Sequence, residues 1–151
     1  MEADINSASM LISAYSALGD SVGARRAAQM SLERAEEVLA RDPNNSLVSG
    51  YSAYALAALG EAERAKARMN RALLIDPDNF NMRYNFACAL CVALKDKESA
   101  LEMLGPVFEA ISDAFLPYAK SDPDFEMIRD DPRYKAMVAA AEARLAAAAG
   151  P

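Results

Sequence analysis

Apolar side chains in residues 46–79 recur at the spacing of two consecutive helices. The first helix is expected to be capped by Asn45 or Ser46 and to end at Gly60, because glycine readily adopts a left-handed conformation. In the second helix, apolar residues follow one another at intervals of four, three and one, so they share one face. These residues are Ala65, Met69, Ala72 and Leu73. The pattern predicts a helical hairpin.

This hairpin belongs to a repeating pattern. Asp42-Pro43-Asn44-Asn45 returns 34 residues later as Asp76-Pro77-Asp78-Asn79, and a fixed period of this size indicates a helical repeat array. We therefore expect one all-α domain over residues 1–151, an α-solenoid of about three helix pairs with a C-terminal capping helix. The expected units are residues 3–45, 46–79 and 80–112, followed by a capping segment at 113–148.

The first unit is longer than the second one. From Gly19, at its expected turn, to Pro43 there are 24 residues, whereas 17 residues separate Gly60 from Pro77. We expect the second helix of this unit to be longer by seven residues, about two turns, which preserves its buried face. The first helix, over residues 3–18, is expected to turn three side chains inward: Leu11, Ile12 and Tyr15.

The third unit is less regular. Its first helix is expected over residues 80–94, and its second helix from Lys97 onward. Gly105-Pro106 lies inside that second helix, where both residues disfavour helical backbone, and this predicts a kink or break near Leu104.

The closing segment differs from the repeats. An acidic connector leads to a helix that Asp131 caps and Pro132 begins. A solenoid needs an atypical last element to cover its final repeat, and apolar side chains of this segment are expected to provide the cover. They are Phe125, Ile128, Tyr134, Met137 and Val138. The residues from Ala146 to Pro151 are expected to fray.

The central unit resembles the tetratricopeptide repeat family. Counted from Ser46, the small positions, the turn and the closing proline of that family fall on Ala53, Gly60, Ala65, Ala72 and Pro77. Two positions depart from the family, because Ser49 stands where a large aromatic residue is frequent and Leu56 where tyrosine is frequent. The resemblance implies an α-helical surface that binds another protein.

The layout of the whole chain resembles a narrower group. Tyr84-Asn85-Phe86-Ala87-Cys88 and the closing residues 122–134 look like the C-terminal repeat domains of bacterial class III adenylate or guanylate cyclases and of winged-helix regulators. The resemblance implies a regulatory role in a signalling protein. No catalytic domain accompanies these residues, so it implies no cyclase activity.

Composition and charge exclude several classes of partner. Of 151 residues 53% are hydrophobic, and 22 acidic against 16 basic residues give a net charge of −6. This charge opposes binding to nucleic acid or to an anionic membrane. The sequence lacks an apolar run of membrane-spanning length and signal-peptide features at its start, so a cytoplasmic protein is expected. The small number of cysteines agrees with a reducing compartment.

Candidate chemistry is sparse. Cys88 and Cys91 form a C-x-x-C pattern, but the pair lies in the middle of an expected helix and the chain has no histidine, so we interpret both as packing residues. The acidic connector does not fit a calcium loop, because Met127 and Arg133 occupy the sixth and twelfth positions counted from Asp122. Capping and solubility explain it better. We expect no metal, no cofactor and no enzymatic activity.

A basic stripe on the second helix of the central unit has two interpretations. Arg64, Arg68 and Arg71 are suited to an acidic partner or a phosphate. Glu61 and Glu63 lie within one turn, however, which favours a solvated outer face with weak ion pairs.

The resemblance also implies a concave groove lined by the first helices. The preferred hypothesis is a peptide held by hydrogen bonds, with Tyr54 and Tyr84 as anchors. Its alternative, that these positions only line the solenoid, stays open, as does a homodimer or other homo-oligomer formed through the N-terminal helix. The family's clamp for a C-terminal carboxylate is not expected, because uncharged residues such as Tyr51 take its place. The groove positions are Asn6, Ser9, Ser13, Ser16, Leu47, Gly50, Tyr54, Asn81, Tyr84, Cys88 and Cys91.

Overall fold

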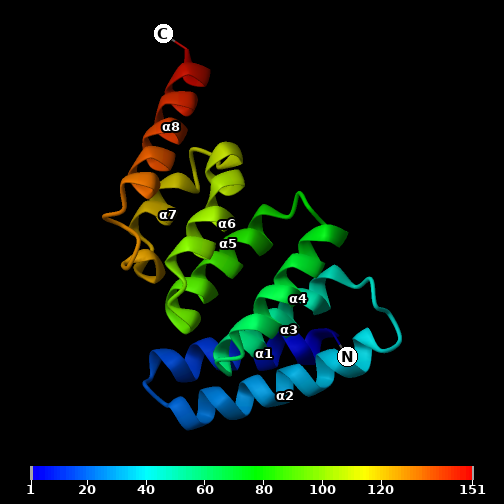
Figure 1. Cartoon of the computed structure of the whole chain (residues 1–151). Helices are drawn as coiled ribbons and strands as arrows, with labels where there is room; N and C mark the ends of the chain where they lie inside the picture. Colours follow the sequence, from blue (N-terminus) through cyan, green and yellow to red (C-terminus); the bar gives the residue numbers. More distant parts are fainter. Residues whose placement is uncertain (1, 151) are drawn as a thin grey trace. The chain divides into compact units, whose positions relative to one another are not determined.

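The chain folds into two compact helical units, Met1–Asn79 and Phe80–Pro151. The computed structural model describes residues 2–150 and the side chains of residues 5–148. Within these residues no β-strand occurs, and the predicted all-α helical repeat fold is confirmed (Figure 1).

The first unit consists of two helical hairpins. Its helices are α1 (Glu2–Ala17), α2 (Ser21–Leu39), α3 (Ser46–Ala58) and α4 (Ala62–Ile75). Gly19 and Gly60 make the two turns with φ angles of 72° and 81°, in the left-handed region that favours glycine. Asn45 caps α3 as predicted, because its Oδ1 accepts a hydrogen bond of 3.0 Å from the amide of Val48.

The core of this unit joins successive helices through small side chains. The predicted inner face of α4 is confirmed, with Ala65, Met69 and Ala72 fully buried and Leu73 at 9% exposure. Two clusters connect α1, α2 and α3. One contains Ile5, Ala35, Leu39 and Val48, and the other Ile12, Ala27, Ala28 and Ala55. Alanine at these contacts lets the helix backbones approach closely.

Two expectations for the first hairpin are wrong. Leu11 is 45% exposed, whereas Ile12 is buried and Tyr15 half-buried, so Leu11 lies outside the inward face. The second helix α2 has 19 residues against 14 in α4, a difference of five rather than seven. Helix α2 ends at Leu39, its last buried residue. The other two of the seven additional residues lie in the loop that leads to α3.

The second unit begins with a helix pair. Its elements are α5 (Phe80–Ala89), a π-helical turn (Leu90–Leu94), α6 (Lys97–Ala110), α7 (Leu116–Ser121), a 3₁₀ turn (Pro123–Phe125) and α8 (Pro132–Ala149). The helix expected over residues 80–94 is therefore present, but its last five residues are π-helical. Lys95, with a φ of 55°, ends this turn.

A kink or break was predicted near Leu104, and the break is wrong, because α6 continues through Gly105-Pro106. It runs from Lys97 to Ala110 with Pro106 inside it. Leu104, Val107 and Phe108 flank this site and are at most 3% exposed. Their burial favours the helix more than one lost backbone hydrogen bond disfavours it.

The capping helix α8 packs against α6. Phe125 and Ile128 are fully buried and Tyr134 is 3% exposed, as predicted, whereas Met137 and Val138 are half-buried. Helix α7 and the 3₁₀ turn, which precede this helix, were not predicted from the sequence. Helix α8 extends to Ala149, so the fraying expected from Ala146 is not seen, and Pro151 lies outside the described residues.

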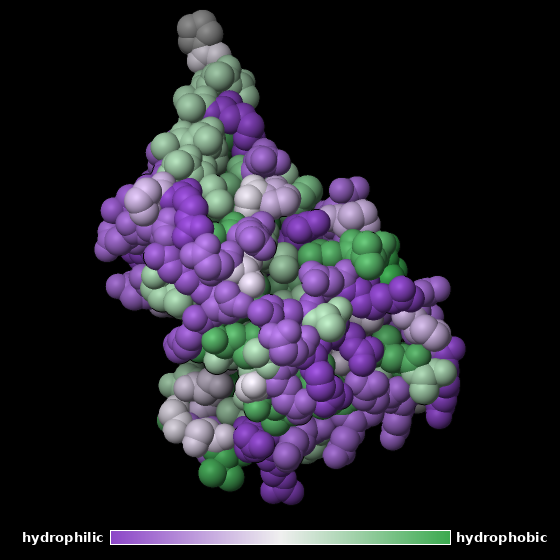
Figure 2. Space-filling view, in the orientation of Figure 1, coloured by the Kyte–Doolittle hydropathy of each residue, from purple (hydrophilic) through white to green (hydrophobic). Residues whose placement is uncertain are grey.

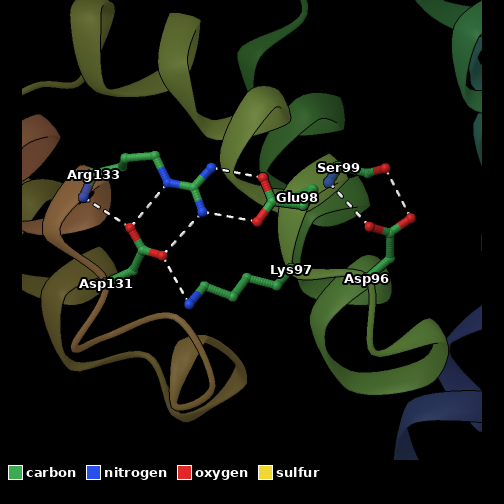
Figure 3. A network of polar contacts seen from close by, with 6 residues as sticks. All are labelled: Asp96, Lys97, Glu98, Ser99, Asp131 and Arg133. Carbon is green, nitrogen blue, oxygen red and sulfur yellow. Dashed lines mark hydrogen bonds and ion pairs between the residues drawn. The ribbon is translucent and has the colours of Figure 1, made fainter.

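A polar network holds the start of α8 to the start of α6 (Figure 3). Asp131 caps α8 through a hydrogen bond of 2.8 Å from the amide of Arg133, and its other oxygen accepts from Lys97 at 2.8 Å. The guanidinium of Arg133 also reaches both carboxylate oxygens of Glu98, at 2.6 and 2.8 Å. The side chain of Asp131 is only 4% exposed. Hydrogen bonds from Arg133 and Lys97 lower the pKa of this carboxyl group below its ordinary value.

We expect Asp131→Asn to weaken the acid dependence of stability. A carboxyl group whose folded pKa is depressed stabilises the fold above its unfolded pKa of about 4, and this contribution is lost as the pH falls through the folded pKa. Thermal melts between about pH 7 and pH 2 should therefore fall more steeply for the parent than for the variant. Asp78→Asn, at an exposed loop position, is the control and should keep the parent slope. Identical slopes for all three proteins would contradict this role of Asp131.

Candidate functional site

The candidate site lies on the first helices of the first two repeats, α1 and α3. The hydroxyl groups of Ser13 on α1 and Tyr54 on α3 form an exposed hydrogen bond of 2.8 Å. The ring of Tyr54 is half-buried and packs against the cluster that contains Ile12 and Ala55. Groove positions that the sequence assigned to α1 and to α3 are therefore in contact in the first unit.

The other predicted residues of this unit divide into exposed and buried ones. Asn6, Ser16 and Leu47 are exposed, and Gly50 is half-buried. Ser9 is only 7% exposed, and its hydroxyl group forms a hydrogen bond of 3.0 Å with that of Ser31 on α2. Its position is therefore inside the α1–α2 hairpin, so it does not line an open surface. The other predicted groove positions of the first unit carry no charge.

Tyr84, expected as an anchor of the groove, is covered by the chain itself. It is 6% exposed, and its hydroxyl group donates a hydrogen bond of 2.5 Å to Asp122. Its ring lies 5.1 Å from Phe115 and 5.1 Å from Phe125, edge to face in both cases. Burial, followed by the hydrogen bond to Asp122, raises the pKa of this phenol. The segment after α6 thus occupies the side of α5 that the sequence assigned to a partner.

The two cysteines lie beside this covered face. Cys88 is half-buried, Cys91 is 1% exposed, and both are free thiols. Burial, followed by the nearby Asp124 carboxylate, raises the pKa of Cys88 and raises that of Cys91 to about 11. Thiols of this kind stay protonated at neutral pH, so they are weak nucleophiles and weak metal ligands. This supports packing as their role. Asn81, the remaining predicted residue of the second unit, is exposed.

The acidic connector acts as a set of helix caps. Asp122 accepts a hydrogen bond of 3.0 Å from the amide of Asp124, in addition to that from Tyr84, and Asp131 caps α8. No group of three or more potential metal-ligating side chains occurs in the part of the chain that the structure describes. The capping interpretation of the connector is supported.

The basic stripe on α4 is engaged with neighbouring polar groups. Arg64 pairs at 2.5 Å with Glu61, the residue before α4, and Arg68 reaches Glu36 on α2 at 2.7 Å. Arg71 donates to Asn44 at 2.8 Å. These contacts favour an outer face with ion pairs, and they further tie α4 to the preceding repeat.

Two features of the structure were not predicted from the sequence. Phe115 and Tyr118 complete the aromatic cluster around Tyr84, and their contribution depends on α7, which was not predicted. Met10 on α1 and Leu18 directly after α1 are 67% and 80% exposed. Three consecutive apolar residues, Met10 to Ile12, cover more than one face of a helix, and this run was the signal that could have indicated an exposed apolar side chain. None of the described helices is long and apolar enough to span a membrane.

Comparison with known proteins supports the helical repeat. The family model of the tetratricopeptide repeat matches residues 23–84, which cover most of α2, all of α3 and α4, and the beginning of α5. No curated protein matches the chain, and the resemblance to cyclase-associated domains receives no support. The matched segment is less than half of the chain. Over residues 23–84 the chain is thus similar to tetratricopeptide repeats, which generally mediate protein–protein interactions, and its fold is an all-α helical repeat.

Proposed function

We propose that the first unit is a non-catalytic protein-interaction module that binds a partner peptide or domain. Its binding face consists of six residues from α1 and α3, called here the groove face. They are Asn6, Ser13, Ser16, Leu47, Gly50 and Tyr54. The observation that carries the proposal is the hydrogen bond between Ser13 and Tyr54, because it joins the predicted stripes of successive first helices into one surface.

The chemistry of the groove face suits an uncharged segment of a partner. Hydroxyl and amide groups of Ser13, Ser16 and Asn6 can donate and accept hydrogen bonds, and Leu47 adds an exposed apolar contact. Tyr54 is a good anchor, because a tyrosine contributes a large apolar ring with little loss of conformational entropy. Gly50, half-buried, lies one helical turn before Tyr54 on α3. A peptide that offers backbone hydrogen-bonding groups and one apolar side chain fits this surface.

The wider setting of the module belongs to the same proposal. We place it in the cytoplasm as a regulatory part of a signalling protein such as a class III cyclase. The support for this setting is the resemblance of residues 84–88 and 122–134 to such domains. Tyr84 and Cys91 are excluded from the partner surface, because both are buried in the second unit.

Tyr54→Ala tests the groove face. Peptides selected from a displayed random library on the parent protein should lose about tenfold or more in affinity for this variant, since a central aromatic anchor typically contributes over 1 kcal/mol. Tyr54→Phe should show a smaller loss, because it removes only the hydroxyl group that contacts Ser13. Leu74→Ala, at an exposed position of α4, is the control and should bind like the parent.

The outcome depends on folded variants, so helicity is measured by circular dichroism for each one. If Tyr54→Ala keeps its helicity and the parent's affinity for every selected peptide, the partner binds elsewhere. A library that yields no binder to the folded parent also contradicts the proposal.

Self-association through the N-terminal helix is the second candidate function. The exposure of Met10 and Leu18 favours it, because exposed large apolar side chains are frequent at interfaces between copies.

A further inference from the structure

The exposed side of α2 carries its basic and acidic residues in two separate groups. Two basic residues, Arg25 and Arg26, precede Met30, and two acidic residues, Glu33 and Glu37, follow it. The four charged side chains are exposed, and Met30 is 38% exposed. At about 3.6 residues per turn the five positions fall on one half of the helix surface, called here the α2 face. In Figure 1 α2 forms one edge of the first unit, and Figure 2 shows mainly hydrophilic side chains along that edge.

The four charged side chains of the α2 face have no hydrogen-bond or ion-pair partner among the described residues. Several charges elsewhere in the chain are paired, as Lys135 is with Asp130 at 2.8 Å. Pairing along α2 would need a spacing of three or four residues, whereas seven separate Arg26 from Glu33. Glu37 lies in the last turn of α2, where the helix dipole favours basic residues instead. The isolated chain therefore gains little stability from these charges.

The α2 face does not owe its exposure to the start of the chain. The turn glycines Gly19 and Gly60 relate α2 to α4 by a shift of 41 residues. A complete hairpin precedes α4, yet positions of α4 that correspond to the α2 face are exposed. They include Ala67, Arg71 and Leu74. Because the second helix of a repeat keeps this side open behind a preceding hairpin, a segment before α1 is not expected to cover the α2 face.

The order of the charges fits the same helix of a second copy in antiparallel orientation. Arg26 lies four residues before Met30, and Glu33 and Glu37 lie three and seven residues after it. A two-fold axis at Met30 therefore places Arg26 of each copy opposite the interval between the two glutamates of the other, and Arg25 lies beside it. A parallel copy would bring like charges together, and a partner with charges of one sign would be repelled by half of the face. The chain itself supplies the complementary order.

We propose that two copies of the chain associate through the α2 face in antiparallel orientation, with the Met30 side chains of both copies at the two-fold axis. The inference is independent of the groove face, which α1 and α3 form. One helix face is a small contact and exposed ion pairs are weak, so the dimer dissociates on dilution. The weight-average mass should rise with concentration from the monomer mass of 16.2 kDa toward twice that value. Added salt should lower it again, because salt screens the ion pairs.

Charge reversal tests the arrangement by sedimentation equilibrium at low salt. The double variants Arg25→Glu/Arg26→Glu and Glu33→Arg/Glu37→Arg should each be monomeric at concentrations where the parent is dimeric. Each variant has charges of one sign along the whole face, so two identical copies repel each other. An equimolar mixture of the two variants should form dimers again, because every contact then joins opposite charges. Circular dichroism checks that both variants keep the parent helicity.

Two further variants are the controls. Glu102→Arg/Glu109→Arg makes the same change in net charge at exposed positions of α6 and should dimerise like the parent. Met10→Glu should also dimerise like the parent, because Met10 lies on α1. A loss of dimers in Met10→Glu would assign the association to the N-terminal helix and overturn the inference.

Three other results contradict the α2 contact. A parent that stays monomeric up to about 1 mM has a dissociation constant weaker than that of a specific dimer. Folded charge-reversal variants that remain dimeric on their own would place the interface elsewhere. Monomeric variants whose mixture also stays monomeric would exclude the antiparallel pairing of the basic group with the acidic group.

Discussion

Ala65→Glu is expected to lower the free energy of unfolding of the first unit by roughly 3 kcal/mol or more, the cost of an uncompensated buried charge. Ala65 is fully buried on the face of α4 that packs against α3. A glutamate there must either lose its hydration or force the two helices apart. The same substitution would also overfill a contact that is made close by alanine.

Ala67→Glu is the matched control, because it makes the same change two residues away on the same helix, where the side chain is exposed. Its effect should lie within about 0.5 kcal/mol. Urea unfolding followed by circular dichroism measures both variants. Equal unfolding midpoints for the two variants would show that the inner face of α4 has been assigned incorrectly.

The first unit was largely predictable, because its boundaries depend on local chemistry. Asn45 as a cap, Gly60 as a left-handed turn and Pro77 after α4 each act within a few residues of their own position. The stripe from Ala65 to Leu73 follows from helical spacing alone. These signals act locally, so they do not depend on contacts with distant parts of the chain.

The second unit was less predictable, because distant contacts decide its structure. Pro106 opposes a helix locally, yet burial of Leu104, Val107 and Phe108 keeps α6 continuous. Sequence periodicity describes which residues share a face but not what covers that face. Likewise, α8 extends to Ala149, although its alanine-rich end was expected to fray from Ala146.

The predicted groove positions show the same difference between local signals and distant contacts. Ser13 and Tyr54 were assigned from repeat positions, and the structure brings them into contact across 41 residues. Ser9 and Tyr84 were assigned to the groove in the same way. Their hydroxyl groups instead form hydrogen bonds inside the protein, with Ser31 and with Asp122. Repeat position thus predicts the side of a helix, whereas accessibility depends on segments that lie outside the repeat.

Tyr84→Ala is expected to lower the free energy of unfolding of the second unit by about 3–5 kcal/mol, the usual range for removing a buried aromatic side chain. The ring is 6% exposed and packs edge to face with Phe115 and Phe125. Its loss leaves a cavity between α5 and the segment after α6. The residue is therefore expected to act in stability and not as a partner anchor.

Tyr84→Phe separates the hydroxyl group from the ring. The Asp122 carboxylate is 6% exposed and accepts from Tyr84 and from the amide of Asp124, so removal of the phenol leaves one oxygen without this donor. The expected loss is about 1–3 kcal/mol, the cost of an unsatisfied buried acceptor. Tyr118→Phe makes the same change at 58% exposure and should stay within about 0.5 kcal/mol of the parent. Urea unfolding curves in which Tyr84→Phe and Tyr118→Phe coincide would show that the hydrogen bond to Asp122 does not hold the closing segment on α5.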